Sequence, residues 1–241
     1  MDRSNSDKFL IIYNDLDKHM RECLQVKTGT PNSYLINQMA KNNRAFAKYK
    51  EDLLAFSRLR NAIIHNPFKK DADPIAEPHE NVVKLYEDIK NQLTCPPSAL
   101  STVAVPRRNI YATSLESKVI DVMNIMVKKS FSHVPVLYDD RIVGIFSEST
   151  FFSYVSKNED IAFSRDTFIG DFKDYIDVNG NVSEYYQFVE KGTLLIDVEE
   201  MFQGNLKDNK RLAVVFITEN GKQNERLLGL VTVWDLAGYC R

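Results

Sequence analysis

The sequence predicts an α+β protein, in which an N-terminal all-α four-helix bundle precedes two repeated β-α-β-β-α units. Apolar residues recur at helical spacing over residues 1–95, whereas short β runs alternate with helices after residue 98. The second half also repeats its own order of elements. The adjacent prolines Pro96 and Pro97 mark a linker, and 241 residues are enough for domains that bury separate cores.

Four amphipathic helices are expected in the first half. Asn5 or Ser6 provides a cap for the first, and Ser33 for the second. Pro67 follows the third helix, which is expected to end before it because proline cannot continue the helical hydrogen bonding. The helices are expected at residues 5–25, 33–49, 51–64 and 79–93. Helices of this length can pack as a small bundle.

The second half contains two copies of one pattern, helix, strand, turn, strand and helix. The corresponding segments are 119–126 and 195–202, 133–138 and 212–217, 142–146 and 227–231, and 149–155 and 233–239. An insertion at residues 156–185 is expected to cover a cleft or to serve an interface. The predicted domains are therefore residues 1–95, 96–157 and 158–241.

The composition is that of a globular protein, with 44% hydrophobic residues, 27% charged residues and a net charge of −2. No run approaches the roughly 18 apolar residues that span a bilayer, and residues 1–8 do not resemble a secretory signal. Three scattered cysteines, Cys23, Cys95 and Cys240, fit reduced thiols better than a disulfide framework. A cytoplasmic protein without a membrane partner is expected.

Arg60, Asn61 and His65 form the most informative short pattern in the chain. Arginine can stabilise a phosphate in a transition state, and histidine can move protons near neutral pH. The pattern R-N-x-x-x-H, followed by Asn66 and Pro67, resembles the ribonuclease motif of HEPN domains, and the resemblance extends over residues 1–95. It implies a helical module that forms a homodimer and pools an arginine and a histidine from each subunit.

In that interpretation His65 assists attack of a ribose 2′-hydroxyl, Arg60 stabilises the phosphorane-like charge, and Asn61 orients the histidine or the RNA. No metal or other cofactor is needed for this catalysis. Arg60 and His65 lie about 140° apart on an ideal helix, so a second subunit would have to complete the site. The alternative is a solvated arginine and a histidine near helix C-terminal carbonyls.

The same motif lies in a basic stretch. Residues 41–70 hold eight lysines and arginines against two acidic residues. Such a segment can hold an RNA backbone by neutralising phosphates. A solvated helix surface is the other interpretation of the same charges.

The repeated half resembles a tandem pair of CBS domains over residues 98–241, so the predicted units are of the CBS type. That resemblance implies an adenine nucleotide ligand such as AMP, ADP or ATP, and a Gly-x-x-Thr/Ser-x-x-Asp pattern at the last strand-to-helix turn. The second copy fits it with Gly229, Thr232 and Asp235. Asp235 would accept hydrogen bonds from a ribose diol, and Thr232 would orient the sugar or a phosphate. Alternatively, both residues only cap the helix.

The first copy departs from this pattern, because Ser147 is followed by Thr150 where the carboxylate would stand. A hydroxyl is a poorer partner for a diol than a carboxylate. Five further nucleotide-binding candidates follow from position in the resemblance alone. They are Thr113, Pro135, Gly192, Thr193 and Arg211.

Other catalytic patterns are absent from the sequence, which has no Walker loop, no G-x-S-x-G elbow and no metal-ligand spacing. His133 is expected to be a structural histidine with its polar atoms satisfied. Trp234 is expected in the core or in a helix-face contact.

Three functions follow. The first is a nucleotide-regulated, metal-independent endoribonuclease of the HEPN type, in which the CBS pair senses an adenine nucleotide. The alternative is a non-catalytic regulatory protein, in which the CBS pair senses adenylates and the helices dimerise or bind a partner. A third is an accessory subunit that contacts a transporter or metabolic enzyme through the CBS pair.

Overall fold

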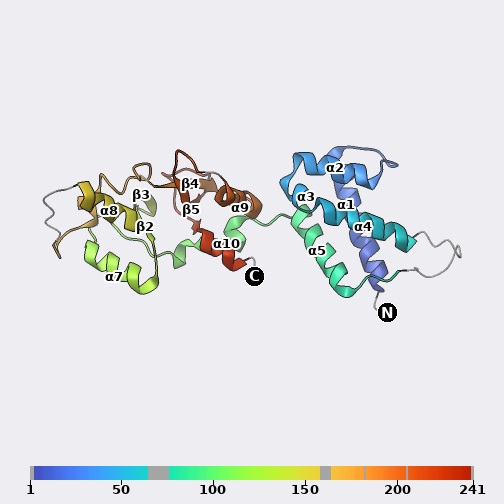
Figure 1. Cartoon of the computed structure of the whole chain (residues 1–241), viewed down its shortest axis with the longest axis horizontal. Helices are drawn as coiled ribbons and strands as arrows, with labels where there is room; N and C mark the ends of the chain where they lie inside the picture. The colour runs from blue at the N-terminus through green and yellow to red at the C-terminus, as the bar shows by residue number, and fades with distance from the viewer. Residues whose placement is uncertain (1–2, 65–75, 158–163, 182, 205, 240–241) are drawn as a thin grey trace. The chain divides into compact units, whose positions relative to one another are not determined.

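The computed structural model describes residues 3–64, 76–157, 164–181, 183–204 and 206–239 (Figure 1). The chain divides into two compact units, Met1–Pro96 and Pro97–Arg241, which we call the helical unit and the repeat unit. His65 and the basic residues Lys69 and Lys70 lie outside the described residues. The predicted mixture of helix and sheet is confirmed. Among the described residues, no helix has the length and apolar character needed to cross a bilayer.

The helical unit has a core of apolar side chains from all of its described helices. Phe9, Phe56 and Tyr86 form an aromatic cluster at its centre, with ring centroids 4.3 to 5.9 Å apart. The helices are α1 (Asn5–Leu24), α2 (Asn32–Asn42), α3 (Arg44–Lys48), α4 (Lys50–Ile64) and α5 (Glu80–Thr94). Periodicity therefore located the first, third and fourth predicted helices to within a few residues.

The second predicted helix is wrong in one respect, because the structure breaks it at Asn43. This residue is extended, with φ −136°, and its side chain accepts a hydrogen bond from the Phe46 backbone N–H at 3.2 Å. Asn43 thus caps α3, a role that asparagine fills well. The new helix direction lets Phe46 become fully buried. The helical unit has five described helices rather than the four expected.

The repeat unit contains a four-stranded sheet, β1-β6-β5-β4, and a separate hairpin of β2 and β3. Among the strands of the described residues, β4 and β5 pair in parallel, and the pairs β1–β6, β2–β3 and β5–β6 are antiparallel. The strands are β1 (Val105–Pro106), β2 (His133–Tyr138), β3 (Arg141–Ser147), β4 (Glu184–Glu190), β5 (Arg211–Thr218) and β6 (Gly229–Val231). Asp139 and Asp140 adopt positive φ angles of 50° and 58°, which suits the tight turn predicted between β2 and β3.

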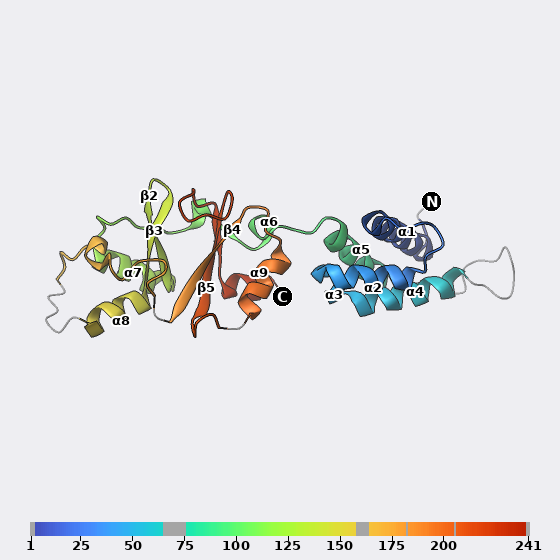
Figure 2. The ribbon, with the colours of Figure 1, turned by 90° about the horizontal axis from the view of Figure 1, so that it is seen from above.

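Helices accompany the strands of each repeat, as the sequence predicts (Figure 2). They are α6 (Ala99–Thr102), α7 (Val119–Lys129), α8 (Glu148–Lys157), α9 (Leu195–Gln203) and α10 (Val233–Tyr239), with short 3₁₀ helices η1 (Arg107–Asn109) and η2 (Ile169–Phe172). Helix α7 buries Val122 and Met126 against Val134 of β2 and Phe146 of β3. Helix α9 buries Val198 against Val215 of β5.

Two segments lie in one predicted repeat in the sequence but pack in the core of the other. Ala99 of α6 is buried with Val198 and Val231 of the second repeat, and β1 pairs with β6. Conversely, Ile169 and Phe172 of η2 are buried in the core of the first repeat. The segment η2, which lies in the insertion, thus contributes to a core, a role that the sequence did not predict. Its side chains complete a core because the first repeat needs apolar cover for β2 and β3.

Candidate functional site

The turn from β6 into α10 brings together two predicted site residues. Asp235 Oδ2 accepts hydrogen bonds from the backbone N–H of Thr232 at 2.7 Å and from its hydroxyl at 2.6 Å. Both side chains are half-buried. The carboxylate thus stabilises the first turn of α10, as expected for a helix cap. Both hydrogen bonds use Oδ2, so the capping role and a ligand role are compatible.

Thr232 and Asp235 line a cavity of about 300 Å³, which we call the second-repeat cavity. Its apolar walls come from both repeats and from the segment that precedes the first repeat. Those walls are Val105, Ile110, Tyr111, Phe131, Pro135, Val214, Phe216 and Leu230. Polar groups are contributed by Asn109, Lys129, Ser130, Ser132 and His133. Apolar walls with a few polar groups are typical of small-molecule sites. Pro135, which the resemblance gave as a candidate of the first copy, lines this cavity.

Trp234 also lines the second-repeat cavity, and 80% of its surface is exposed. Of the two placements expected for Trp234, the core is therefore wrong. Trp234 lies on the first turn of α10, between Thr232 and Asp235 in sequence, where the helix turns its side chain toward solvent at the cavity. A tryptophan in this position can respond to a ligand.

In the corresponding turn of the first repeat, from β3 into α8, Ser147 and Thr150 are hydrogen-bonded to each other. Thr150 donates to the carbonyl of Ile145 at 3.3 Å and accepts from the Ser147 backbone N–H at 3.2 Å. The two hydroxyl oxygens are 3.0 Å apart, and both residues are buried. Thr150 therefore performs the capping function that Asp235 performs in the second repeat. Neither residue lines the second-repeat cavity, but Ser147 lines the apolar groove between α7 and α8.

Beside this turn lies a set of polar residues centred on Glu184, which we call the Glu184 cluster. Arg211 donates to Oε1 from Nη2 at 2.7 Å and from Nε at 3.2 Å. His133 Nε2 donates to Oε2 at 2.8 Å, and the hydroxyl of Ser149 contacts Oε2 at 3.4 Å. Asn181 donates to the Ser149 hydroxyl at 2.7 Å. The predicted site residue Arg211 is thus already paired with a carboxylate.

The surroundings of Glu184 favour its charged form. Its side chain is only 4% exposed, whereas that of Arg211 is 73% exposed. The hydrogen bond from His133, followed by the Arg211 interaction, outweighs burial and lowers the Glu184 pKa to about 2. His133 is a structural histidine, as predicted, because Nδ1 also lies 2.9 Å from the Ser132 hydroxyl.

Three predicted residues do not reach either group. Thr113 is buried and forms an isolated parallel bridge with Val136 of β2. Gly192 and Thr193 form the turn before α9, where the Thr193 N–H donates to Glu190 and its carbonyl accepts from Ala99. Neither of these last two residues is among those that line the second-repeat cavity. Position in the sequence pattern alone therefore does not put Gly192 and Thr193 at either group of residues.

Arg60 and Asn61 line a polar cleft of about 370 Å³ in the helical unit, between α1, α4 and the start of α2. The Arg60 guanidinium lies over the ring of Tyr13 at 5.3 Å from its centroid, and Nη1 donates to Asn61 Oδ1 at 3.3 Å. Asp17 and Arg21 of α1 form an ion pair in the same cleft, at 2.7 Å. The predicted partner His65 is outside the described residues, so the structure places two of the three predicted catalytic residues.

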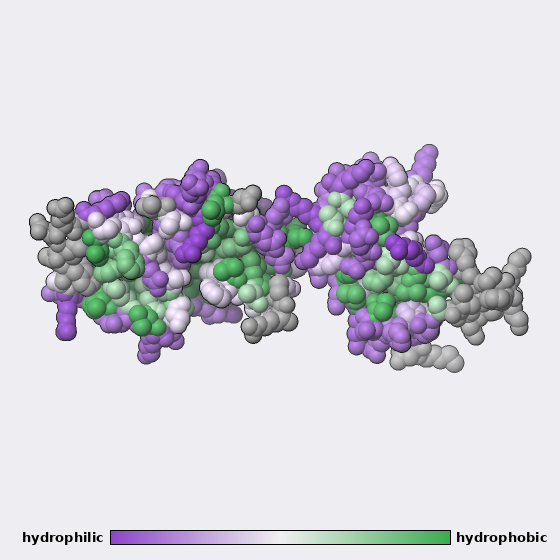
Figure 3. Space-filling model, in the orientation of Figure 1, coloured by the Kyte–Doolittle hydropathy of each residue, from purple (hydrophilic) through white to green (hydrophobic). Residues whose placement is uncertain are grey.

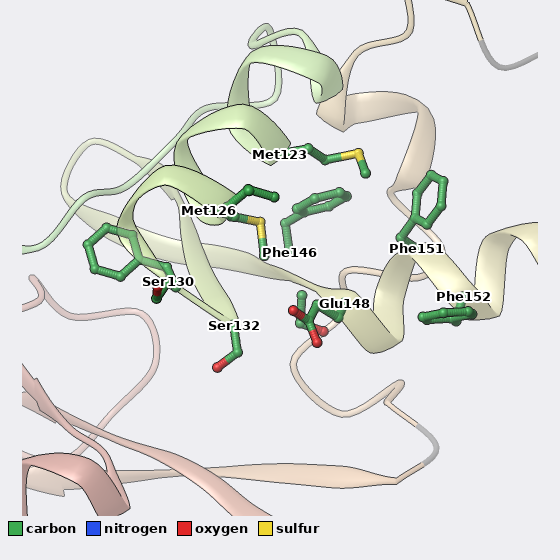
Figure 4. Close-up of a pocket in the computed structure, with 11 residues that line it drawn as sticks. Met123, Met126, Ser130, Ser132, Phe146, Glu148, Phe151 and Phe152 are labelled. Atoms are coloured by element: carbon green, nitrogen blue, oxygen red, sulfur yellow. The ribbon is translucent and has the colours of Figure 1, made fainter.

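An apolar groove lies between α7 and α8 (Figure 4). Met123, Met126, Phe146 and Phe151 line its volume of about 540 Å³, and Glu148 is its only charged lining residue. Exposed apolar side chains also lie on these helices (Figure 3), including Val127 on α7 and Phe152 on α8. Such a surface is typical of contacts between proteins. Its few polar groups suit a nucleotide poorly.

Comparison with protein families identifies the class of the first repeat. Residues 102–157 match the family model of the CBS domain. This match confirms a CBS domain in the first of the two predicted copies. Comparison with curated protein sequences gives no match.

The chain is similar to solved structures of proteins with CBS domains. The structure of CBSX2 in complex with AMP has 16% identity and a TM-score of 0.42, with 60% of this chain and 96% of that chain covered. CbpB in complex with c-di-AMP has 17% identity and a TM-score of 0.45, with coverage of 64% and 90%. A CBS domain protein from Streptococcus pneumoniae TIGR4 has 13% identity and a TM-score of 0.41, with coverage of 58% and 80%.

Proposed function

We propose that the chain is a regulatory protein that senses an adenine nucleotide in the second-repeat cavity. The observation that carries this proposal is the placement of Thr232 and Asp235 at the edge of an apolar cavity, beside the start of α10. The CBS domain match over residues 102–157 supports a ligand-binding role of this kind. The cavity combines an apolar surface for a base with polar groups for a sugar and a phosphate.

The lining residues suggest how a nucleotide binds. Tyr111, Pro135 and Leu230 offer apolar contact to adenine. The oxygens of Asp235 can accept hydrogen bonds from the ribose hydroxyls. Lys129 is the only lysine or arginine among the lining residues, and its ammonium can pair with a phosphate. One lysine and a volume of about 300 Å³, at the lower end for ligand cavities, favour a mononucleotide with few phosphates, such as AMP.

Calorimetric titration tests this function. AMP is expected to bind with one molecule per chain, and more tightly than ATP, because Lys129 is the only lysine or arginine lining the cavity. The chain has one tryptophan, so quenching or shift of Trp234 fluorescence is expected to saturate with the same midpoint. CMP serves as a control for the base. Absence of heat and of a fluorescence change with AMP, ADP and ATP would contradict the proposal.

The HEPN-type ribonuclease remains a second candidate function, and the polar cleft around Arg60 and Asn61 is the observation that favours it. A cleft that exposes an arginine and a carboxamide together can hold an RNA phosphate. Asp17 in the same cleft opposes a polyanion, but it is paired with Arg21. A homodimer would bring the arginine and histidine of two chains together, as the family resemblance implies.

Incubation of the purified chain with RNA in the presence of a chelator tests this second function. Cleavage is expected to leave a cyclic 2′,3′-phosphate end and to be lost in Arg60→Gln, because the cation that stabilises the transition state is removed. Arg58→Gln is the matched control on the same helix. RNA that stays intact with the wild-type chain, or full cleavage by His65→Ala, would remove the ribonuclease from consideration.

A further inference from the structure

Glu184 presents a buried carboxylate to donors from several separate segments. Its two oxygens accept hydrogen bonds from Arg211 and His133 at 2.7 to 3.2 Å, and Ser149 lies 3.4 Å from Oε2. A guanidinium that donates through two nitrogens, an imidazole and a hydroxyl are the groups with which proteins bind phosphate. The cluster therefore has the chemistry of an anion site, and an internal carboxylate is its anion.

The position of this cluster in the first repeat corresponds to that of the second-repeat cavity in the second. Each lies beside the turn from the last strand into the closing helix, at Ser147–Thr150 in one and Thr232–Asp235 in the other. Each also lies beside the start of a segment that pairs in parallel with a strand. Glu184 begins β4, which is parallel to β5, and Asn109 to Tyr111 precede Thr113, which pairs in parallel with β2.

The two positions also share His133. This residue lines the second-repeat cavity, while its Nε2 donates to Glu184. The Glu184 side chain is 4% exposed, so little space remains beside it for a second anion. A phosphate at this place would meet a fixed negative charge at close range and would have to displace it.

We propose that Glu184 is an intramolecular anion that occupies the ligand position of the first repeat, so that the repeat unit binds one nucleotide rather than two. For the nucleotide itself, this inference rests on the function proposed above. Removal of the carboxylate charge releases the donors of Arg211 and His133 and creates a second anion site. Glu184 is thus the residue that sets the number of ligands.

Binding stoichiometry tests this inference. Calorimetry with AMP is expected to give one site per chain in the wild type and two in Glu184→Gln and Glu184→Ala. Glu190→Gln, at the exposed end of the same strand, is the matched control and keeps one site. Glu184→Asp retains the charge and is also expected to keep one site. Two sites in the wild type, or a single site in both folded variants, would overturn the inference.

Inorganic phosphate separates this inference from the proposed nucleotide function. In ³¹P NMR titrations, Glu184→Gln is expected to bind one more phosphate than the wild type, whether or not AMP binds the second-repeat cavity. A wild type that does not bind AMP would contradict the proposed function alone. Equal phosphate binding by the wild type and both variants would contradict the inference alone. The wild-type AMP stoichiometry can overturn the inference even where a variant does not fold.

Discussion

Acidification is expected to destabilise the repeat unit by about 3 kcal/mol through Glu184 alone, as the pH falls from about 4.5 to about 2. The hydrogen bond from His133 and the contact with Arg211 hold the folded-state pKa at about 2, against 4.5 for an ordinary glutamate. Because the folded-state pKa is the lower one, the stabilisation is complete above the unfolded-state value. It is lost as the pH falls through the folded-state value.

Urea unfolding at a series of pH values measures this effect. The difference in unfolding free energy between the wild type and Glu184→Gln is expected to shrink by about 3 kcal/mol across that range, since glutamine does not titrate. Glu225, whose pKa is also about 2 because Asn220 donates to it, is present in both proteins and cancels. Parallel curves for the two proteins would show that Glu184 is not the group responsible.

Local patterns predicted much of the helical unit. Phe9, Leu16 and Met20 recur along α1 at helical spacing, and all three are buried. The break at Asn43 was missed because apolar residues continue on both sides of it at helical spacing. What interrupts the helix is one side-chain hydrogen bond to the Phe46 N–H, and asparagine can also be tolerated inside a helix.

The candidate ligand site was predictable only where its residues lie close together in the sequence. Thr232 and Asp235 stand three residues apart in one turn, so a sequence pattern records their relation. Glu184 was missed because its partners are distant, with His133 51 residues away and Arg211 27 residues away. No local pattern indicates such contacts. The cavity residues Tyr111, Lys129 and Trp234 were missed because the segment before the first repeat and the ends of α7 and α10 meet only in the fold.

The predicted domain boundary at residue 157 does not coincide with the boundary between the two hydrophobic cores, because each core includes a segment from the other side of residue 157. Ala99 completes the core of the second repeat, and Phe172 completes that of the first. Each repeat therefore depends on residues from the other for a closed core. A fragment cut between residues 157 and 158 would expose both sets of apolar side chains, so the repeat unit should be studied whole.

Asp235→Ala is expected to weaken AMP binding by about 10- to 100-fold, because a hydrogen bond to a charged group contributes about 1.5–3 kcal/mol. The expected partners of the carboxylate are the ribose hydroxyls. The same substitution also removes the hydrogen bonds to Thr232 that stabilise the first turn of α10. A loss of affinity alone therefore does not distinguish contact with the ligand from a change in the helix end.

A double cycle with 2′-deoxy-AMP separates these two roles of Asp235. The wild type is expected to bind 2′-deoxy-AMP about tenfold more weakly than AMP, whereas Asp235→Ala is expected to bind both alike, because the lost hydroxyl no longer has a partner. Thr150→Ala, at the equivalent turn of the first repeat, is the matched control and should retain the preference for AMP. If Asp235→Ala still prefers AMP by the wild-type factor, the carboxylate acts only as a helix cap, and recognition of the ribose must come from other residues of the cavity.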